Sequence, residues 1–214
     1  MKAIVIGATG AVGRDLLDVL LHDERYDRVI TFTRREVGVE HSRLQSYIVD
    51  FDKPEGWQDL VQGDVLFSAL GTSKKQAGSK EAQYHVDHDY QMLFARLARR
   101  HGVPRLVLIS SIGADASSRI FYLRLKGEIE QEVRELGFPS LTILEPPSLI
   151  RPHAKRPLET LSVKALQLLN TIGLCRSMAP MSTKVVARSM AACGADEFAG
   201  TRVIAGQDIK KYSK

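Results

Sequence analysis

Tyr122 and Lys126 are the two residues of this chain whose types and spacing point most directly to chemistry. Side chains four residues apart lie on the same face of a helix, about one turn from each other. A lysine ammonium beside a tyrosine hydroxyl stabilises the phenolate, because the opposite charges attract. Such a tyrosine can act as a general acid or base near neutral pH. The same spacing also occurs by chance, so the position of the pair in the fold decides its meaning.

Three glycines near the N-terminus, Gly7, Gly10 and Gly13, form a second motif. They follow an apolar run over residues 3–6 and precede a helical pattern over 14–21, and this strand, turn and helix order is typical of dinucleotide binding. The amides at the start of the helix and the helix dipole together bind a pyrophosphate. We expect Gly7 to allow the turn, Gly10 to admit the phosphates and Gly13 to let the helix pack closely. The residues between the glycines that we also expect to contact the cofactor are Thr9, Ala11 and Val12.

Arg34 and Arg35 follow the apolar run 28–33 and bear on the choice of cofactor. An acid at this point would bind a ribose 2′-hydroxyl and repel a 2′-phosphate. Paired guanidinium groups instead suit a phosphate, which predicts NADPH rather than NADH. The alternative is that both arginines are simply solvated, and Glu36 is near enough in sequence to neutralise one of them.

The ends of the later strands should supply the remaining contacts with the cofactor. We expect Asp50 to meet the adenine amino group, with Phe51 beside it. Lys126 is expected to bind the nicotinamide ribose as well as to act on Tyr122. The other expected cofactor contacts are Ala69, Leu70, Gly71, Thr72, Ser110 and Pro147.

Hydrophobic periodicity alternates strand and helix patterns along the chain. The predicted strands cover 3–6, 28–33, 46–49, 64–70, 105–110 and 141–144. The predicted helices cover 14–21, 57–61, 81–101 and 118–136. This alternation predicts an α/β fold, a doubly wound parallel sheet with helices on both faces and the ligand at the carboxyl ends of the strands.

The pattern loosens after Pro152, where we expect helices near 158–169 and 184–193 and a strand at 202–205. We therefore predict a single domain over 1–214, in which residues 150–214 form a small cap on the substrate side.

Composition excludes several classes of protein. The chain has 214 residues, a formal net charge of +5 and two cysteines without metal-ligand spacing. No apolar stretch approaches the roughly 20 residues of a membrane helix, so we expect no membrane span. The cysteines are expected to be free thiols in a reducing cytoplasm. The basic residues lack the interleaved aromatics of a nucleic-acid site, and His85 and His88 match no zinc signature, so neither nucleic acid nor metal is expected.

Four stretches together resemble the Tat-interacting protein family, a group of atypical short-chain dehydrogenase/reductases that bind NADPH. The stretches are 7–13, 70–79 with 86–90, 110–118 and 122–130. The resemblance implies a Rossmann fold in which Tyr122 and Lys126 are the reactive pair. It also implies a serine that orients the substrate oxygen, for which Ser111 is our choice, with Ser117 and Ser118 as alternatives. The family carries Arg-Pro-Gly after the sixth strand, whereas this chain has Glu145-Pro146-Pro147.

Two main functions follow from these observations. The first is an NADPH-dependent oxidoreductase acting on a small carbonyl or alcohol whose identity the sequence does not reveal. The second is a non-catalytic protein that binds NADPH and reports redox state, with a protein partner or a homodimer as its interaction. A nucleotide-sugar epimerase or dehydratase is a weaker third alternative, because about sixty residues after Pro152 are few for a sugar-nucleotide domain.

Overall fold

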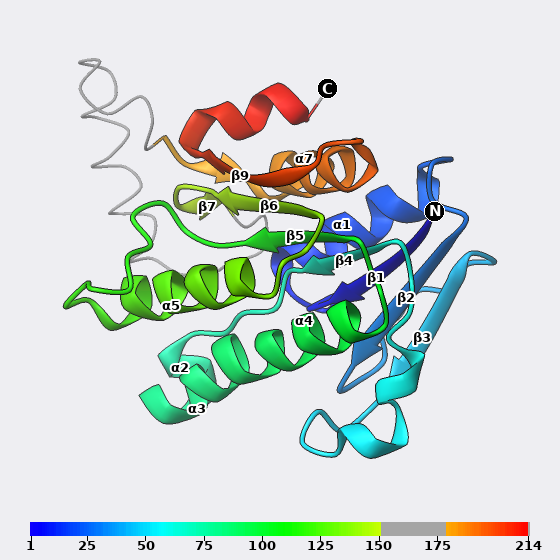
Figure 1. Ribbon diagram of the computed structural model, residues 1–214, viewed down its shortest axis with the longest axis horizontal. Helices are drawn as coiled ribbons and strands as arrows, with labels where there is room; N and C mark the ends of the chain where they lie inside the picture. The colour runs from blue at the N-terminus through cyan, green and yellow to red at the C-terminus, as the bar shows by residue number, and fades with distance from the viewer. Residues whose placement is uncertain (151–178, 214) are drawn as a thin grey trace.

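A computed structural model describes residues 1–150 and 179–213 of the chain (Figure 1). Within these residues, seven parallel strands form one sheet in the order β3-β2-β1-β4-β5-β6-β9. The strands are β1 (Lys2–Ile6), β2 (Arg28–Thr33), β3 (Leu44–Ile48), β4 (Val65–Ser68), β5 (Arg105–Ile109), β6 (Ser140–Glu145) and β9 (Gly200–Ala205). A separate short pair is formed by β7 (Leu149–Ile150) and β8 (Met181–Ser182).

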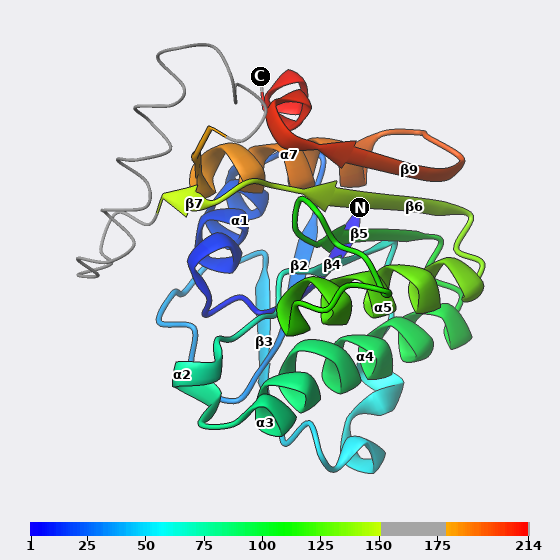
Figure 2. The ribbon, with the colours of Figure 1, turned by 90° about the vertical axis from the view of Figure 1, so that its left-hand side faces the viewer.

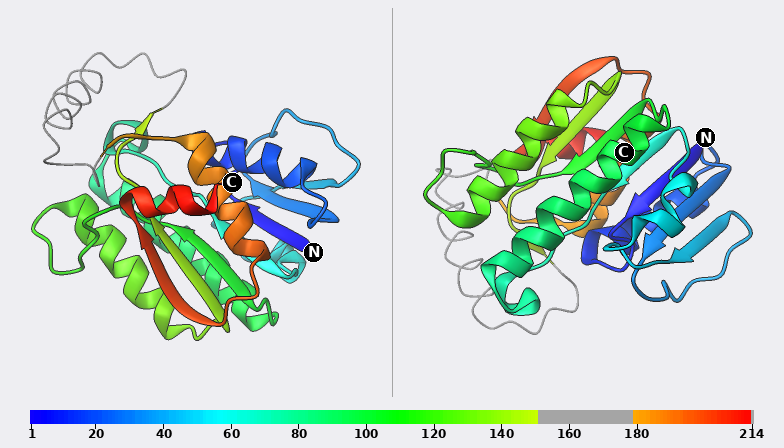
Figure 3. Two further views of the ribbon diagram at one scale, coloured as in Figure 1. Left: turned by 90° about the horizontal axis from the view of Figure 1, so that it is seen from above. Right: turned by 60° about the horizontal axis from the view of Figure 1, so that its bottom comes forward.

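Helices cover both faces of the sheet (Figures 1 and 3). One face carries α1 (Ala11–His22) and α7 (Thr183–Ala195), which pack against each other. The other face carries α4 (Tyr90–Arg100) and α5 (Phe121–Glu135). The remaining helical segments are α2 (Lys74–Ala77), α3 (Lys80–Tyr84), η1 (Pro54–Gly56), η2 (Gln58–Leu60), η3 (His85–Asp89) and η5 (Gly206–Tyr212). The predicted doubly wound α/β fold is confirmed.

The strand order reverses between β1 and β4, because β2 lies on one side of β1 and β4 on the other. The connections that leave these two strands therefore diverge to opposite sides and leave a crevice at their carboxyl ends. The glycine turn after β1 and the loop after β4 both lie there, so the topology brings together two segments that are far apart in sequence.

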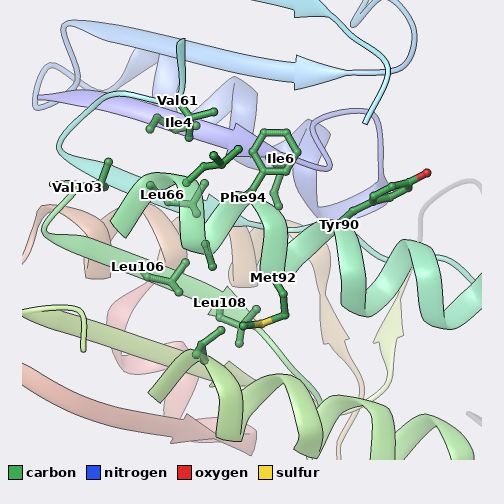
Figure 4. Close-up of a cluster of buried hydrophobic side chains, with 14 of the residues drawn as sticks. Ile4, Ile6, Val61, Leu66, Tyr90, Met92, Phe94, Val103, Leu106 and Leu108 are labelled. Atoms are coloured by element: carbon green, nitrogen blue, oxygen red, sulfur yellow. The ribbon is translucent and has the colours of Figure 1, made fainter. Parts of the chain in front are cut away.

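Alternation along β1 divides the core into two hydrophobic layers. Ile4 and Ile6 pack under α4, whereas Ala3 and Val5 pack under α1 and α7. Successive side chains of a strand point to opposite faces, so a sheet covered on both sides needs an apolar residue at every position. Figure 4 shows the first layer, in which Phe94 of α4 is fully buried against the strands.

The predicted helix over 81–101 is interrupted in the structure. Between α3 and α4 the chain makes one wider π-helical segment, η3, over His85–Asp89. Such an insertion rotates the following turns relative to those before it, and is often found at functional sites. Periodicity alone missed it, because one extra residue in a long amphipathic helix hardly changes the hydrophobic pattern.

The predicted cap over 150–214 is wrong for two of its elements. The strand predicted at 202–205 is part of β9, which pairs with β6 as the seventh strand of the sheet. The helix predicted at 184–193 is part of α7, which lies on the sheet beside α1. α7 buries apolar side chains against the sheet, and β9 pairs along its edge. No local pattern specifies either contact. The helix predicted near 158–169 lies outside the described residues.

No helix in the described part of the chain is long and apolar enough to cross a membrane.

Candidate functional site

Two adjoining cavities lie at the carboxyl ends of the strands. The larger, which we call the arginine cavity, has a volume of about 990 Å³ and reaches Arg34, Arg35 and Phe51. The smaller, which we call the tyrosine cavity, has a volume of about 530 Å³ and contains Tyr122 and Lys126. The residues that line both are Gly10, Ala11, Ala69, Leu70, Gly71, Thr72 and Gln76. Together they form a long site of the kind that accepts an extended ligand.

The glycine turn between β1 and α1 forms the wall that the two cavities share. Gly7 has a positive φ of 82°, and a Cβ there would lie 2.4 Å from the backbone of Ala69. A Cβ on Gly13 would lie 2.0 Å from the carbonyl oxygen of Gly7, so α1 can pack this closely only with glycine. Gly10 is the N-cap of α1 and provides no side-chain cap. The first N–H groups of α1 therefore remain available to an anion.

The residues of the glycine turn differ in which cavity they line. Gly7, Thr9, Gly10 and Ala11 line the arginine cavity. Val12 is buried in the apolar layer between α1 and the sheet, although it also touches the tyrosine cavity. Gly13 lines neither cavity, which agrees with a role in packing.

The arginine cavity ends at the carboxyl end of β2. Arg34 and Arg35 are exposed there, and both lie in its wall. Phe51 is buried and lines the same cavity. Asp50 does not line it: its carboxylate lies 3.6 Å from the Lys53 ammonium, and its backbone oxygen accepts from the Trp57 indole. The structure thus brings Phe51 to the cavity but not the carboxylate expected to meet an adenine.

Tyr122 and Lys126 both lie on the first two turns of α5 and line the tyrosine cavity. Tyr122 is 39% exposed, so a small molecule in the cavity can reach its hydroxyl. Lys126 is 4% exposed, and its Nζ donates to the carbonyl oxygen of Ile109 at 3.2 Å. This contact ties the ammonium to the end of β5. The pair therefore combines an accessible phenol with a fixed positive charge.

The serines after β5 differ in what they contact. Ser111 lines the tyrosine cavity and makes only a long contact of 3.4 Å to the carbonyl oxygen of Ile112. Ser110 also lines it, but its hydroxyl donates to the buried Glu130 carboxylate. Ser117 donates to the Asp115 carboxylate and Ser118 accepts from a backbone N–H, and neither lines the cavity. Ser111 is thus the serine whose hydroxyl is available beside Tyr122.

Asp87 is a cavity residue that sequence reasoning did not select. It lies on η3, is 1% exposed, and accepts from the backbone N–H of Thr72 at 2.6 Å. Burial raises the pKa of the Asp87 carboxyl, and the charge of Lys126 opposes part of that shift. The contact holds the loop after β4 in the cavity wall. The available signal was an aspartate among the apolar positions of a helix.

Glu145 lies near two charged residues of α5, Glu130 and Arg134. Glu145 is half-buried, and burial together with the neighbouring Glu130 charge raises the pKa of its carboxyl. Glu130 is 4% exposed and is paired with Arg134 at 3.1 Å. Glu145 does not line either cavity, whereas Pro147 lines the tyrosine cavity as expected. Within the described residues, no group of three or more metal-ligand side chains is found.

Gly127 of α5 provides a test of how the loop that carries Ser111 is held. A Cβ at this position would lie 2.1 Å from Ala116 N, a contact between backbones that a side-chain rotation cannot relieve. We expect Gly127→Ala to lower the free energy of unfolding by about 2–3 kcal/mol in urea titration. Gly56→Ala is the control and should have little effect, because nothing lies within 4 Å of a Cβ there. Equal stability of the two variants would show that the loop is not packed on α5.

A glycine turn at the start of α1, with a long cavity at the point where strand order reverses, defines a Rossmann-fold protein that binds a dinucleotide. Residues 7–193 match the model of the family described as NAD(P)H-binding, and the chain belongs to that family.

Two relatives agree with this assignment, and a solved structure shares the fold. The chain is 30% identical over 224 residues to "Protein FMP52, mitochondrial" of Meyerozyma guilliermondii, a match that covers 100% of this chain and 96% of that protein. It is 36% identical over 153 residues to "Protein HTATIP2" of Rattus norvegicus, covering 70% and 63%. The expected relationship to the Tat-interacting protein family is thereby confirmed. The fold is similar to that of MoeE5 in complex with UDP-glucose and NAD, with a TM-score of 0.72, 14% identity, and 95% and 75% of the chains covered.

The cytoplasmic location expected from the cysteines is contradicted by these relatives, because the FMP52 proteins are named as mitochondrial. A free thiol is compatible with any reducing compartment, so it does not distinguish the cytoplasm from another one. Cys193 is buried, which raises the pKa of its thiol to about 11 and keeps it unreactive. Cys175 lies outside the described residues.

Proposed function

We propose that this protein is an NADPH-dependent oxidoreductase acting on a small carbonyl or alcohol. One observation carries the proposal: Tyr122, Lys126 and Ser111 line one cavity, and that cavity adjoins the glycine turn. The nicotinamide, when bound, supplies or accepts the hydride. The protein's own residues then have to bind the substrate oxygen and move one proton.

Each of the three side chains has a distinct role in this reaction. When a carbonyl is reduced, the Tyr122 hydroxyl donates its proton to the substrate oxygen as that oxygen gains negative charge. Lys126 stabilises the phenolate that remains, because its ammonium lines the same cavity and is held by the Ile109 carbonyl. Ser111 donates a hydrogen bond to the same substrate oxygen and orients it. When an alcohol is oxidised, Tyr122 takes the proton instead, so that hydride and proton balance in both directions.

The choice of NADPH over NADH depends on Arg34 and Arg35. Both guanidinium groups lie in the wall of the arginine cavity at the end of β2, where a ribose 2′-phosphate would lie. Glu36 is exposed and does not line the cavity, so it does not oppose a phosphate from within the site. Charge-assisted hydrogen bonds to phosphate are strong, although water screens part of their energy at exposed groups.

We expect the double variant Arg34→Ala/Arg35→Ala to lose about tenfold or more in NADPH affinity while NADH affinity changes little, because only NADPH carries the 2′-phosphate. Calorimetric titration with both cofactors measures this. Arg28→Ala is the matched control, since Arg28 is an exposed arginine at the opposite end of the same strand. A wild-type protein that binds both cofactors equally would rule out the proposed preference.

A second candidate function is a non-catalytic NADPH-binding protein that reports redox state. It is favoured by Glu145, which stands where the family resemblance implies an arginine. A panel of quinones, aldehydes and ketones, followed by cofactor absorbance, separates the two functions. Tight NADPH binding without turnover of any of these compounds would favour the second. The likeness to a structure holding a nucleotide sugar does not support a sugar substrate here, because at 14% identity it concerns the fold alone.

A further inference from the structure

The N-terminus of α7 lies in the wall of the arginine cavity. Thr183 is the first residue of this helix, and both Thr183 and Lys184 line the cavity. Ser182 is the N-cap, and its hydroxyl accepts from the Lys184 N–H at 3.3 Å. The helix has 13 residues, long enough for its dipole to place a partial positive charge at this end.

Thr183 has an unusual environment for a hydroxyl group. The residue is 1% exposed, and within the described part of the chain its Oγ1 has no hydrogen-bond partner. Burial of a hydroxyl without a partner is unfavourable, so such groups are rare and are usually satisfied by water, an ion or a ligand. Thr183 is in the cavity wall, although its Oγ1 atom is enclosed. Rotation about the Cα–Cβ bond toward the cavity lets a ligand there provide the missing partner.

The charges around Thr183 favour an anion. The N-termini of α1 and α7 line the same cavity, so two positive helix ends lie there together (Figure 2). Arg14 on α1 and Lys184 on α7 add two positive side chains to the wall. Asp15 also lines the cavity and is the opposing negative charge. The balance of side chains and helix ends at this place remains positive.

We propose that Thr183 and the N-terminus of α7 form a second anion site, which binds the diphosphate of the dinucleotide together with the glycine turn. The inference rests on the proposed function, since it requires that a dinucleotide occupies the cavity. The Thr183 hydroxyl donates a hydrogen bond to a phosphate oxygen, and Lys184 contributes a screened charge. The glycine turn then holds one part of the diphosphate and α7 the other.

The test is Thr183→Val, which removes the hydroxyl and nearly keeps the shape. We expect the dissociation constants of NADPH and NADH to rise together by about tenfold or more, because both cofactors carry the diphosphate. The ratio of the two constants should stay at its wild-type value, unlike in the Arg34 and Arg35 variant. Without cofactor, the thermal midpoint of Thr183→Val should equal or exceed that of the wild type, because an unsatisfied buried hydroxyl has been removed.

Two further variants complete the experiment. Ser189→Ala removes another buried hydroxyl of α7, one that donates to the carbonyl oxygen of Ile209 at 2.7 Å. It should lower the thermal midpoint and leave both dissociation constants unchanged. Thr183→Ser keeps the hydroxyl and should bind both cofactors with nearly wild-type affinity.

Several outcomes overturn the inference. If Thr183→Val binds both cofactors as tightly as the wild type, the hydroxyl does not contact the diphosphate. If the variant is destabilised without cofactor, the hydroxyl has a structural partner. If the wild type binds neither cofactor, the proposed function fails first, and this result is distinguishable because it does not depend on the Thr183 variant.

Discussion

Replacement of Tyr122 by phenylalanine should lower kcat by about 10²–10⁴-fold and leave NADPH affinity almost unchanged, because a positioned general acid contributes about this factor. The substitution removes one oxygen from a side chain that is already accessible in the tyrosine cavity. It leaves the Lys126 contact with Ile109 intact. The measurement is steady-state turnover of a compound found in the carbonyl panel, together with calorimetric titration of NADPH.

Two controls separate proton transfer from general damage. Tyr47→Phe removes a hydroxyl on the edge strand β3, outside both cavities, and should keep full activity. Lys126→Met should lower both turnover and NADPH affinity, because this lysine is expected to bind the ribose as well as to stabilise the phenolate. Full activity of Tyr122→Phe would mean that another group transfers the proton.

Gly10→Val should abolish NADPH binding while the protein remains folded. Gly10 is in the wall that both cavities share, where a diphosphate has to approach the backbone closely. A Cβ there lies 3.1 Å from the Gly7 carbonyl oxygen, a tight contact that a small shift relieves. The two methyl groups of valine then occupy the space that the diphosphate needs. Calorimetry measures the binding, and circular dichroism with thermal unfolding measures the fold.

The effect should be specific to this glycine. Gly56→Val is the control, because a Cβ on Gly56 meets nothing within 4 Å, and NADPH affinity should not change. Gly13→Ala should behave differently from both, since its Cβ would overlap the Gly7 carbonyl oxygen at 2.0 Å and destabilise the packing of α1 itself. If Gly10→Val binds NADPH at wild-type strength, the glycine turn is not the phosphate site.

Local patterns in the sequence predict much of this architecture. The first six predicted strands and the helices α1, α4 and α5 correspond to predicted segments, because burial on both faces of a parallel sheet requires continuous apolar runs and surface helices require amphipathic ones. The glycine motif was readable for the same reason: positive φ and close backbone contact restrict residue type at single positions, as at Gly7 and Gly13. The spacing of Tyr122 and Lys126 likewise predicted a shared face of one helix.

Other features of the site depend on contacts between segments that are distant in sequence. Asp87 became a cavity residue because η3 interrupts the helix and turns the carboxylate toward the Thr72 N–H. Ser110 and Ser111 both line the tyrosine cavity, but only the Ser110 hydroxyl donates to the Glu130 carboxylate of α5. The position of Glu130 therefore decides that Ser111 is the serine available to a substrate. Thr183 lines the arginine cavity because α7 packs beside α1 on the sheet. Each outcome depends on contacts across many residues, whereas periodicity and spacing report only on neighbours along the chain.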